Sequence, residues 1–114
     1  MNEPVSISNA EHYAWGDLCD GWHLLRDENL SVIEERMPPG AREQRHFHNK
    51  SRQFFYVLEG EVTMEVEGQL FPLLARQGLE IAPGRPHQVL NRSGIDARFL
   101  VISQPPSHGD RQPA

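Results

Sequence analysis

The sequence has 114 residues and a net charge of -5, from 11 lysines and arginines against 16 aspartates and glutamates, with the histidines counted as neutral. A chain of this length is enough for one domain, and its scattered basic residues do not form the positive patch that nucleic-acid binding requires. No apolar run approaches the roughly 18 residues of a membrane span, and Met1–Ala10 lacks the pattern of a signal peptide. We therefore expect a single cytoplasmic domain, residues 1–114, with no nucleic-acid or membrane partner.

In chain order, the pattern is one of short strands and turns. Leu30–Met37 alternates in part, and Pro38-Pro39-Gly40 then breaks the pattern. The following runs are bounded by Gly or Pro turns or rich in β-branched and aromatic residues; they are His46–His48, Gln53–Leu58, Val62–Val66, Gln69–Leu74, Leu79–Ala82, His87–Asn91 and Arg98–Ile102. Such spacing predicts an all-β sandwich or barrel. We expect the barrel core at about residues 24–103, with the N-terminal segment and the tail 104–114 peripheral.

His46 and His48 are separated by one residue. Successive side chains of a strand point to opposite faces, so both imidazoles project the same way while Phe47 points away. Two imidazoles about 7 Å apart along a strand, joined by groups from neighbouring strands, can converge on one cation. This pair is therefore the first candidate for a metal site.

The pair lies within a longer pattern that resembles a known family. Gly40, five residues, His46-x-His48, four residues, Gln53, six residues and Gly60 resemble the first motif of the cupin superfamily. That motif usually has Glu at the position of Gln53.

A second stretch, Pro83-Gly84-Arg85-Pro86-His87 followed by three residues and Asn91, resembles the second cupin motif. Together the two motifs resemble those of small single-domain bacterial cupins of the conserved-barrel (cupin 2) type. The resemblance implies an all-β fold, a small double-stranded β-helix or jelly-roll barrel.

The resemblance also implies that His46, His48, Gln53 and His87 bind a divalent transition metal, either Fe, Mn, Ni or Zn. Gln53 has two alternatives: it ligates through its carbonyl oxygen while its amide nitrogen is held by an acceptor, or it is a hydrogen-bonded amide beside a three-histidine site. In either case it cannot accept a proton, so a mechanism that uses the motif glutamate as a general base is excluded.

Alternation predicts what faces the interior. The candidate residues for a substrate pocket share the inward register; they are Phe55, Val57, Met64, Phe99 and Val101.

The opposite face of the same strand carries Phe54, Tyr56 and Leu58, which are also apolar or aromatic. A single small barrel covers only the inner face of a strand, so the outer face predicts a homodimer, with cover by the N-terminal segment as the alternative.

Two classes of function fit these features. The first is a metal-dependent enzyme that acts on a small oxygenated or acidic metabolite by dioxygenase, isomerase or lyase chemistry. The second is a non-catalytic module that binds a small molecule or a metal. Some cupins that open uronates share the ligand set but rely on an acidic residue late in the barrel, which Arg98–Ile102 lacks. The absence of that residue counts against uronate opening. A cavity lined only by metal ligands and apolar side chains, without an acid or base, favours binding or redox chemistry over hydrolysis.

Three further expectations concern polar residues other than the candidate metal ligands. Glu65 and Glu67 are expected to be exposed on a hairpin, and Asn91 is expected to anchor the turn after His87. Asp110 and Arg111 are expected to form at most a salt bridge within a loose tail.

Overall fold

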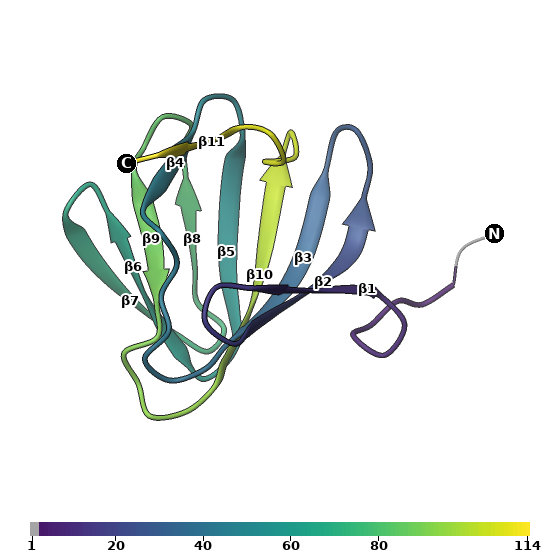
Figure 1. Ribbon diagram of the computed structural model, residues 1–114, viewed down its shortest axis with the longest axis horizontal. Helices are drawn as coiled ribbons and strands as arrows, with labels where there is room; N and C mark the ends of the chain where they lie inside the picture. Colours follow the sequence, from purple (N-terminus) through teal and green to yellow (C-terminus); the bar gives the residue numbers. More distant parts are fainter. Residues whose placement is uncertain (1–2) are drawn as a thin grey trace.

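The computed structural model describes residues 3–114, which form strands and connecting turns without a helix (Figure 1). Within this range there is accordingly no helix that could cross a membrane. The strands form two antiparallel sheets, which confirms the predicted all-β jelly-roll class. The six-stranded sheet contains, in spatial order, β1 (Glu11–Trp15), β2 (Cys19–Arg26), β3 (Ser31–Met37), β10 (Ala97–Gln104), β5 (Arg52–Glu59) and β8 (Gly78–Ile81). The five-stranded sheet contains β11 (Arg111–Pro113), β4 (His46–His48), β9 (His87–Leu90), β6 (Glu61–Val66) and β7 (Gln69–Leu74).

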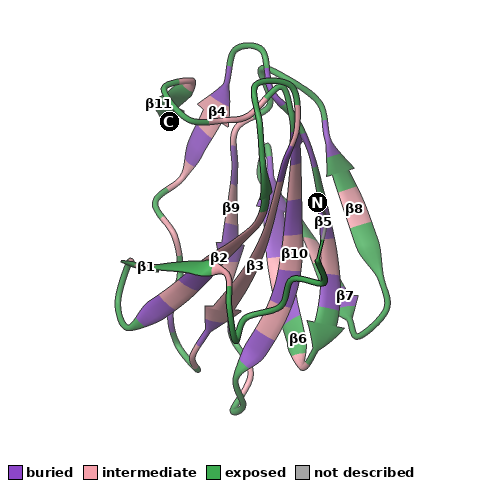
Figure 2. Ribbon diagram, turned by 90° about the vertical axis from the view of Figure 1, so that its right-hand side faces the viewer, coloured by how far each residue is buried: buried purple, intermediate pink, exposed green. Residues whose placement is uncertain are grey.

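Strand β5 shows how alternation fills the interior. Gln53, Phe55 and Val57 are buried, while Phe54 and Leu58 keep 40% and 36% of their surface exposed. Alternate residues of a strand point to opposite faces of the sheet, so this pattern of burial confirms the predicted orientation of the β5 side chains. Figure 2 shows similar alternating bands of buried and less buried residues along β10.

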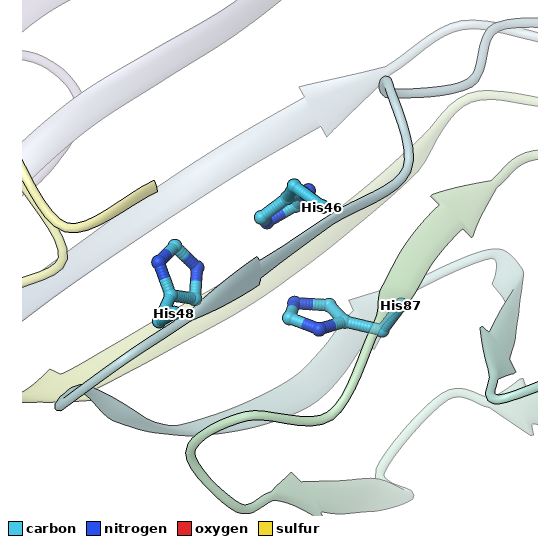
Figure 3. Close-up of side chains that lie close together, drawn as sticks. All are labelled: His46, His48 and His87. Atoms are coloured by element: carbon cyan, nitrogen blue, oxygen red, sulfur yellow. The ribbon is translucent and has the colours of Figure 1, made fainter. Parts of the chain in front are cut away.

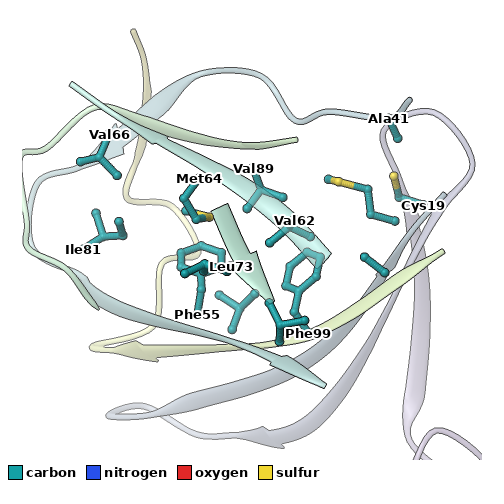
Figure 4. Packing of buried hydrophobic residues seen from close by; sticks show 14 residues of the cluster. Cys19, Ala41, Phe55, Val62, Met64, Val66, Leu73, Ile81, Val89 and Phe99 are labelled. Carbon is teal, nitrogen blue, oxygen red and sulfur yellow. The ribbon is translucent and has the colours of Figure 1, made fainter. Parts of the chain in front are cut away.

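The buried apolar side chains lie between the two sheets (Figure 4). They come from both sheets and from the connections between them; they are Cys19, Met37, Ala41, Phe55, Val57, Val62, Met64, Val66, Leu73, Ile81, Val89, Ala97, Phe99 and Val101. This core supports one end of the interior, and the polar side chains described below line the other.

The two sheets extend beyond residues 24–103 at both ends. Strands β1 and β2 continue the larger sheet beside β3, and β11 adds an edge to the smaller sheet beside β4. The first strand gives no clear apolar alternation because it is an edge strand with mostly exposed residues. Strands β1 and β2 of the N-terminal segment and strand β11 of the tail are therefore parts of the sheets.

Asn91 anchors the connection after β9, as predicted. Its side-chain amide donates to the carbonyls of Met37 and Ile95 at 2.9 and 2.8 Å, and its Oδ1 accepts from the backbone and hydroxyl of Ser93. Only 1% of Asn91 is exposed, so these bonds satisfy a buried polar group.

Two glycines in the connections provide a test: Gly60 lies between β5 and β6, which belong to different sheets, and Gly68 lies in the hairpin between β6 and β7. Gly60 and Gly68 both have a positive φ, of 74° and 87°, but an added Cβ would lie 2.5 Å from the Asp96 carbonyl oxygen at Gly60 and would have open space at Gly68. Gly68→Ala should therefore cost about 1–2 kcal/mol of unfolding free energy from backbone strain alone. Gly60→Ala should cost at least about 1 kcal/mol more because of the clash. Urea denaturation measures both, and equal losses would contradict the account.

Candidate functional site

Three histidines meet beside the interior cavity, and two of them, His46 and His48, line it. His46 and His48 lie on β4, and His87 begins β9 directly opposite His46 in the antiparallel pairing. One ring nitrogen from each residue can be chosen so that all three lie within 4.8 Å of one another. The rings point toward a common space (Figure 3), and the residues are only 4%, 5% and 1% exposed. The structure thus brings together the three histidines that the sequence motifs indicate.

Each ring is oriented by a backbone carbonyl. The Nδ1 atoms of His46, His48 and His87 lie 2.8, 3.0 and 2.9 Å from the carbonyl oxygens of Gln44, Asp110 and Arg85 respectively. A carbonyl only accepts, so each Nδ1 carries the proton and each Nε2 presents a lone pair. The Nε2 atoms of His48 and His87 are buried with no hydrogen-bond partner among the described residues. This is the arrangement that a histidine metal ligand requires.

Gln53 on β5 contributes an oxygen to the same region. Its Nε2 donates to Ser103 Oγ at 3.0 Å, while its Oε1 is buried and has no partner in residues 3–114. An unpartnered buried carbonyl oxygen is costly unless something binds it. The residues present therefore fit a metal ion, and direct ligation by Gln53 stays a prediction.

Burial also keeps the imidazoles neutral. Removal from water lowers the pKa of His46 to about 3, and the pKa of His48 and His87 falls for the same principal reason. Neutral imidazole is the form that binds metal ions, so protons do not compete strongly for these ligands at pH 7.

The C-terminal tail is tied to this site, which corrects the expectation for Asp110. The Asp110 carboxylate accepts hydrogen bonds from the backbone amides of Asn49, Lys50 and Ser51 at 2.9–3.0 Å, and its carbonyl accepts from His48. Those three amides lower the pKa of Asp110. The tail therefore holds the turn after β4 instead of lying loose.

A cavity of about 400 Å³ opens beside the histidines. Of the five residues expected to form a substrate pocket, Phe55 and Val101 line it, whereas Val57, Met64 and Phe99 are packed in the core away from it. The remaining lining comes from the N-terminal strands, β3, the segment before β4, β4, β5 and the tail; it is Tyr13, Trp15, His23, Arg26, Ser31, Ile33, Glu35, Glu43, His46, His48, Gln53, Pro106, Ser107, His108, Gly109 and Arg111.

Glu35 and Glu43 correct the expectation of a cavity without an acid or base. Both carboxyls line the cavity, and burial raises the pKa of Glu35 to about 7 and that of Glu43 to about 8. Glu35 shares the face of β3 with Ile33 and Met37, so its inward position could have been read from alternation. Glu43 lies outside the strands, and no sequence pattern indicated its position.

Glu65 is a second correction. It is only 8% exposed, and Arg45 Nε donates to its Oε1 at 2.7 Å. The ion pair lowers the pKa of Glu65, so the residue is a buried carboxylate and not an exposed hairpin charge.

The jelly-roll fold and a buried three-histidine cluster together define the class of protein, and comparison with known proteins identifies the family. Residues 33–103 match the cupin-domain family Cupin_2, and the chain belongs to this family.

Known relatives and solved structures support this assignment. The chain is 38% identical over 69 residues to polyketide synthase CurC of Streptomyces cyaneus, a match covering 60% of this chain and 45% of that protein. It therefore spans less than half the length of CurC. The polyketide cyclase RemF of Streptomyces resistomycificus is 20% identical with a TM-score of 0.82, covering 99% and 83% of the two chains. An RmlC-like cupin of Shewanella frigidimarina is 19% identical with a TM-score of 0.84, covering 96% of each chain. These two structures support the fold.

The two cavity glutamates make stability depend on pH. Both hold protons more tightly in the folded protein, so the stabilisation from their protonated forms is complete below about pH 4.5 and is lost as the pH rises through about 7 and about 8. The unfolding free energy of the metal-free protein should fall between about pH 6.5 and 8.5, and Glu43→Gln should remove on the order of 1–2 kcal/mol of this fall. Urea denaturation across this range checks it, with the exposed Glu59→Gln as a matched control. An equal fall in wild type and Glu43→Gln would contradict it.

Proposed function

We propose that the protein is a metal-dependent enzyme that rearranges a small oxygenated or acidic molecule by proton transfer, an isomerase-type reaction. One observation carries the proposal: unpartnered ligand atoms of His48 and Gln53 open on the same cavity as two carboxyls, Glu35 and Glu43. Metal ligands and groups that exchange protons near neutral pH are the two parts that such chemistry needs.

His46, His48 and His87 would hold the metal, with Gln53 as a fourth ligand. A divalent Fe, Mn, Ni or Zn ion bound there would act as a Lewis acid toward an oxygen atom of the substrate. The chain's own residues bind and orient the molecule: Ile33, Phe55 and Val101 provide apolar contact, and Arg111 provides a positive charge. The cavity volume of about 400 Å³ suits a small metabolite.

The names of two relatives favour a particular substrate class. CurC is a polyketide synthase protein and RemF a polyketide cyclase, and polyketides carry carbonyl groups at alternate carbons. A β-dicarbonyl unit presents two oxygens to a cation and has an acidic C–H between them. We therefore propose a β-dicarbonyl or enol substrate, in preference to dioxygenase chemistry.

A non-catalytic binding module is the alternative. The position of Glu35 and Glu43 favours the enzyme, because a module that only stored a metal would have no need of two half-buried carboxyls of raised pKa near it.

We also propose a homodimer that covers the outer face of β5. Phe54 and Leu58 are exposed and Tyr56 is half-buried on that face, and the rings of Phe54 and Tyr56 are stacked with centroids 6.5 Å apart. The N-terminal strands extend the sheet on the far side of β3 and β10, so they do not supply this cover.

Sedimentation velocity at micromolar concentration tests the homodimer. Wild type should sediment as a dimer, and Phe54→Arg should shift it toward monomer because a charge would be buried in the contact. Leu70→Arg, at a residue 51% exposed on β7, is the matched control and should stay dimeric. A monomeric wild type would refute the dimer.

The metal site is tested by elemental analysis of protein purified without chelators. Wild type should contain about one divalent metal ion per chain, and His48→Ala should weaken binding at least about 100-fold, since even contacts to metal ligands are worth about 10- to 100-fold. Gln53→Glu should bind more tightly because a carboxylate neutralises half of the charge of the cation.

His12→Ala is the matched control, because His12 lies outside the cavity and bonds to Asp20. It should keep the metal. A wild type that folds fully and takes up no divalent metal would overturn the proposed function.

A further inference from the structure

We propose that Glu35 is the group that exchanges a proton with the molecule bound in the cavity, and that Tyr13 is its positioning residue, reaching it across Gly21. This inference rests on the proposed function and names the residue that would carry its proton transfer.

The three residues form a row across neighbouring strands. Tyr13 of β1 is the register partner of Gly21 of β2, and Gly21 is in turn the register partner of Glu35 of β3. The Tyr13 hydroxyl donates to Glu35 Oε2 at 2.7 Å. The phenol thus spans the intervening strand to reach the carboxyl.

Gly21 makes this reach feasible. A Cβ at residue 21 would overlap the ring of Tyr13, at Cζ, Cε1 and the hydroxyl oxygen. Any side chain there would displace the phenol from Glu35. The glycine is therefore explained by close approach of a ring and not by a turn, since its φ is not in the left-handed region.

The carboxyl faces a space that other groups mark as a binding site. Glu35 lines the same cavity as His48 and Gln53, whose Nε2 and Oε1 atoms are unpartnered among residues 3–114. Those two residues are 5% and 4% exposed. Buried polar atoms without partners point to a ligand, independently of the glutamates.

Charged and titratable groups surround Glu35 on several sides. β10 presents the apolar Phe99 as its register partner. The groups from the other elements that line the cavity or lie close enough to interact electrostatically come from five parts of the chain. They are Tyr13 of β1, Cys19, His23 and Arg26 of β2, Glu43 before β4, His46 and His48 on β4, and His108 and Arg111 of the tail.

These surroundings place the pKa of Glu35 near neutral pH. Burial raises its pKa to about 7, while the Tyr13 hydrogen bond and the charge of Arg111 limit the rise. Burial and the negative charge of Glu35 raise the pKa of Glu43 to about 8. A carboxyl that is half ionised near the working pH is suited to both accept and return a proton.

The proposed step is balanced within one substrate molecule. The Glu35 carboxylate takes a proton from a carbon next to a carbonyl: the C–H bond breaks, an O–H bond forms on Glu35, and the electron pair stays on the substrate as an enolate. Glu35 then returns the proton to a different atom of the same molecule. No oxidant, reductant or second substrate is required.

The first test uses pentane-2,4-dione, which has two carbonyl oxygens and an acidic C–H between them. Metal-loaded wild type in deuterated buffer should accelerate deuterium uptake at the central carbon, measured by proton NMR, and Glu35→Gln should lose at least tenfold of the acceleration. Glu34→Gln is the matched control, because Glu34 is the neighbouring residue on β3, lies outside the cavity and pairs with Arg98 at 3.4 Å. It should keep the wild-type rate.

The second test needs neither metal nor substrate. In the metal-free protein, carbon-13 NMR of the glutamate carboxyls should show Glu35 titrating near pH 7, with assignment from Glu35→Gln. Tyr13→Phe should raise the pKa of Glu35, because the hydrogen bond that it removes favours the carboxylate. Gly21→Ala should move the pKa of Glu35 the same way. When the first test is repeated with both variants, the pH profile of deuterium uptake should shift in parallel.

Several outcomes would overturn the inference. The first is deuterium uptake with wild type that is no faster than in buffer alone. The second is equal deuterium uptake with wild type and with Glu35→Gln, and the third is a pKa of Glu35 at the usual value for a glutamate. Calorimetric titration with the metal alone tests the proposed function separately. A wild type that binds no metal refutes the proposed function, whereas the carbon-13 NMR titration of the metal-free protein still tests the role of Glu35.

Discussion

Three imidazole rings are packed close together beside the cavity, and each can be buried there only as a neutral ring whose Nδ1 proton is satisfied. The carbonyls of Gln44, Arg85 and Asp110 provide the three acceptors. They belong to the segment before β4, the turn before β9 and the C-terminal tail, which are far apart in sequence. The positions of these three segments are therefore constrained by the rings that they accept hydrogen bonds from. The tail is held beside β4 because the His48 ring requires the carbonyl of Asp110.

The interior has two chemically different ends. Apolar side chains such as Val57, Met64 and Phe99 are packed together at one end, and their stabilisation comes from removal of apolar surface from water. The other end holds histidines, an amide and two carboxyls around a cavity, where polar groups are left without protein partners. The packed end stabilises the domain, so that the other end can keep unsatisfied groups ready for a ligand.

In our proposal, metal ligation and proton exchange are two separate roles. Gln53 stands where the cupin motif usually has Glu, and an amide can bind a cation but cannot exchange a proton. Carboxyls are found instead at Glu35 and Glu43, on other parts of the cavity wall. In our proposal, ligation and proton exchange are thus assigned to different residues, each with its own supporting contacts: Ser103 for Gln53, and Tyr13 for Glu35.

The sequence by itself determined the all-β class, most of the strands, the facing of β5 and the three histidines, because these depend on the two-residue period of a strand and on motifs with fixed spacing. Only the tertiary structure decided the composition of the cavity. Tyr13, Glu35 and Glu43 come from three separate segments, and the pairing of β1, β2 and β3 brings the first two together. Val57, Met64 and Phe99 share the inward register but lie in the core, because alternation determines which face a side chain takes and not how far along the barrel the cavity extends. The partners of a polar residue such as Asp110 or Glu65 are likewise set by contacts distant in sequence, which no local pattern records.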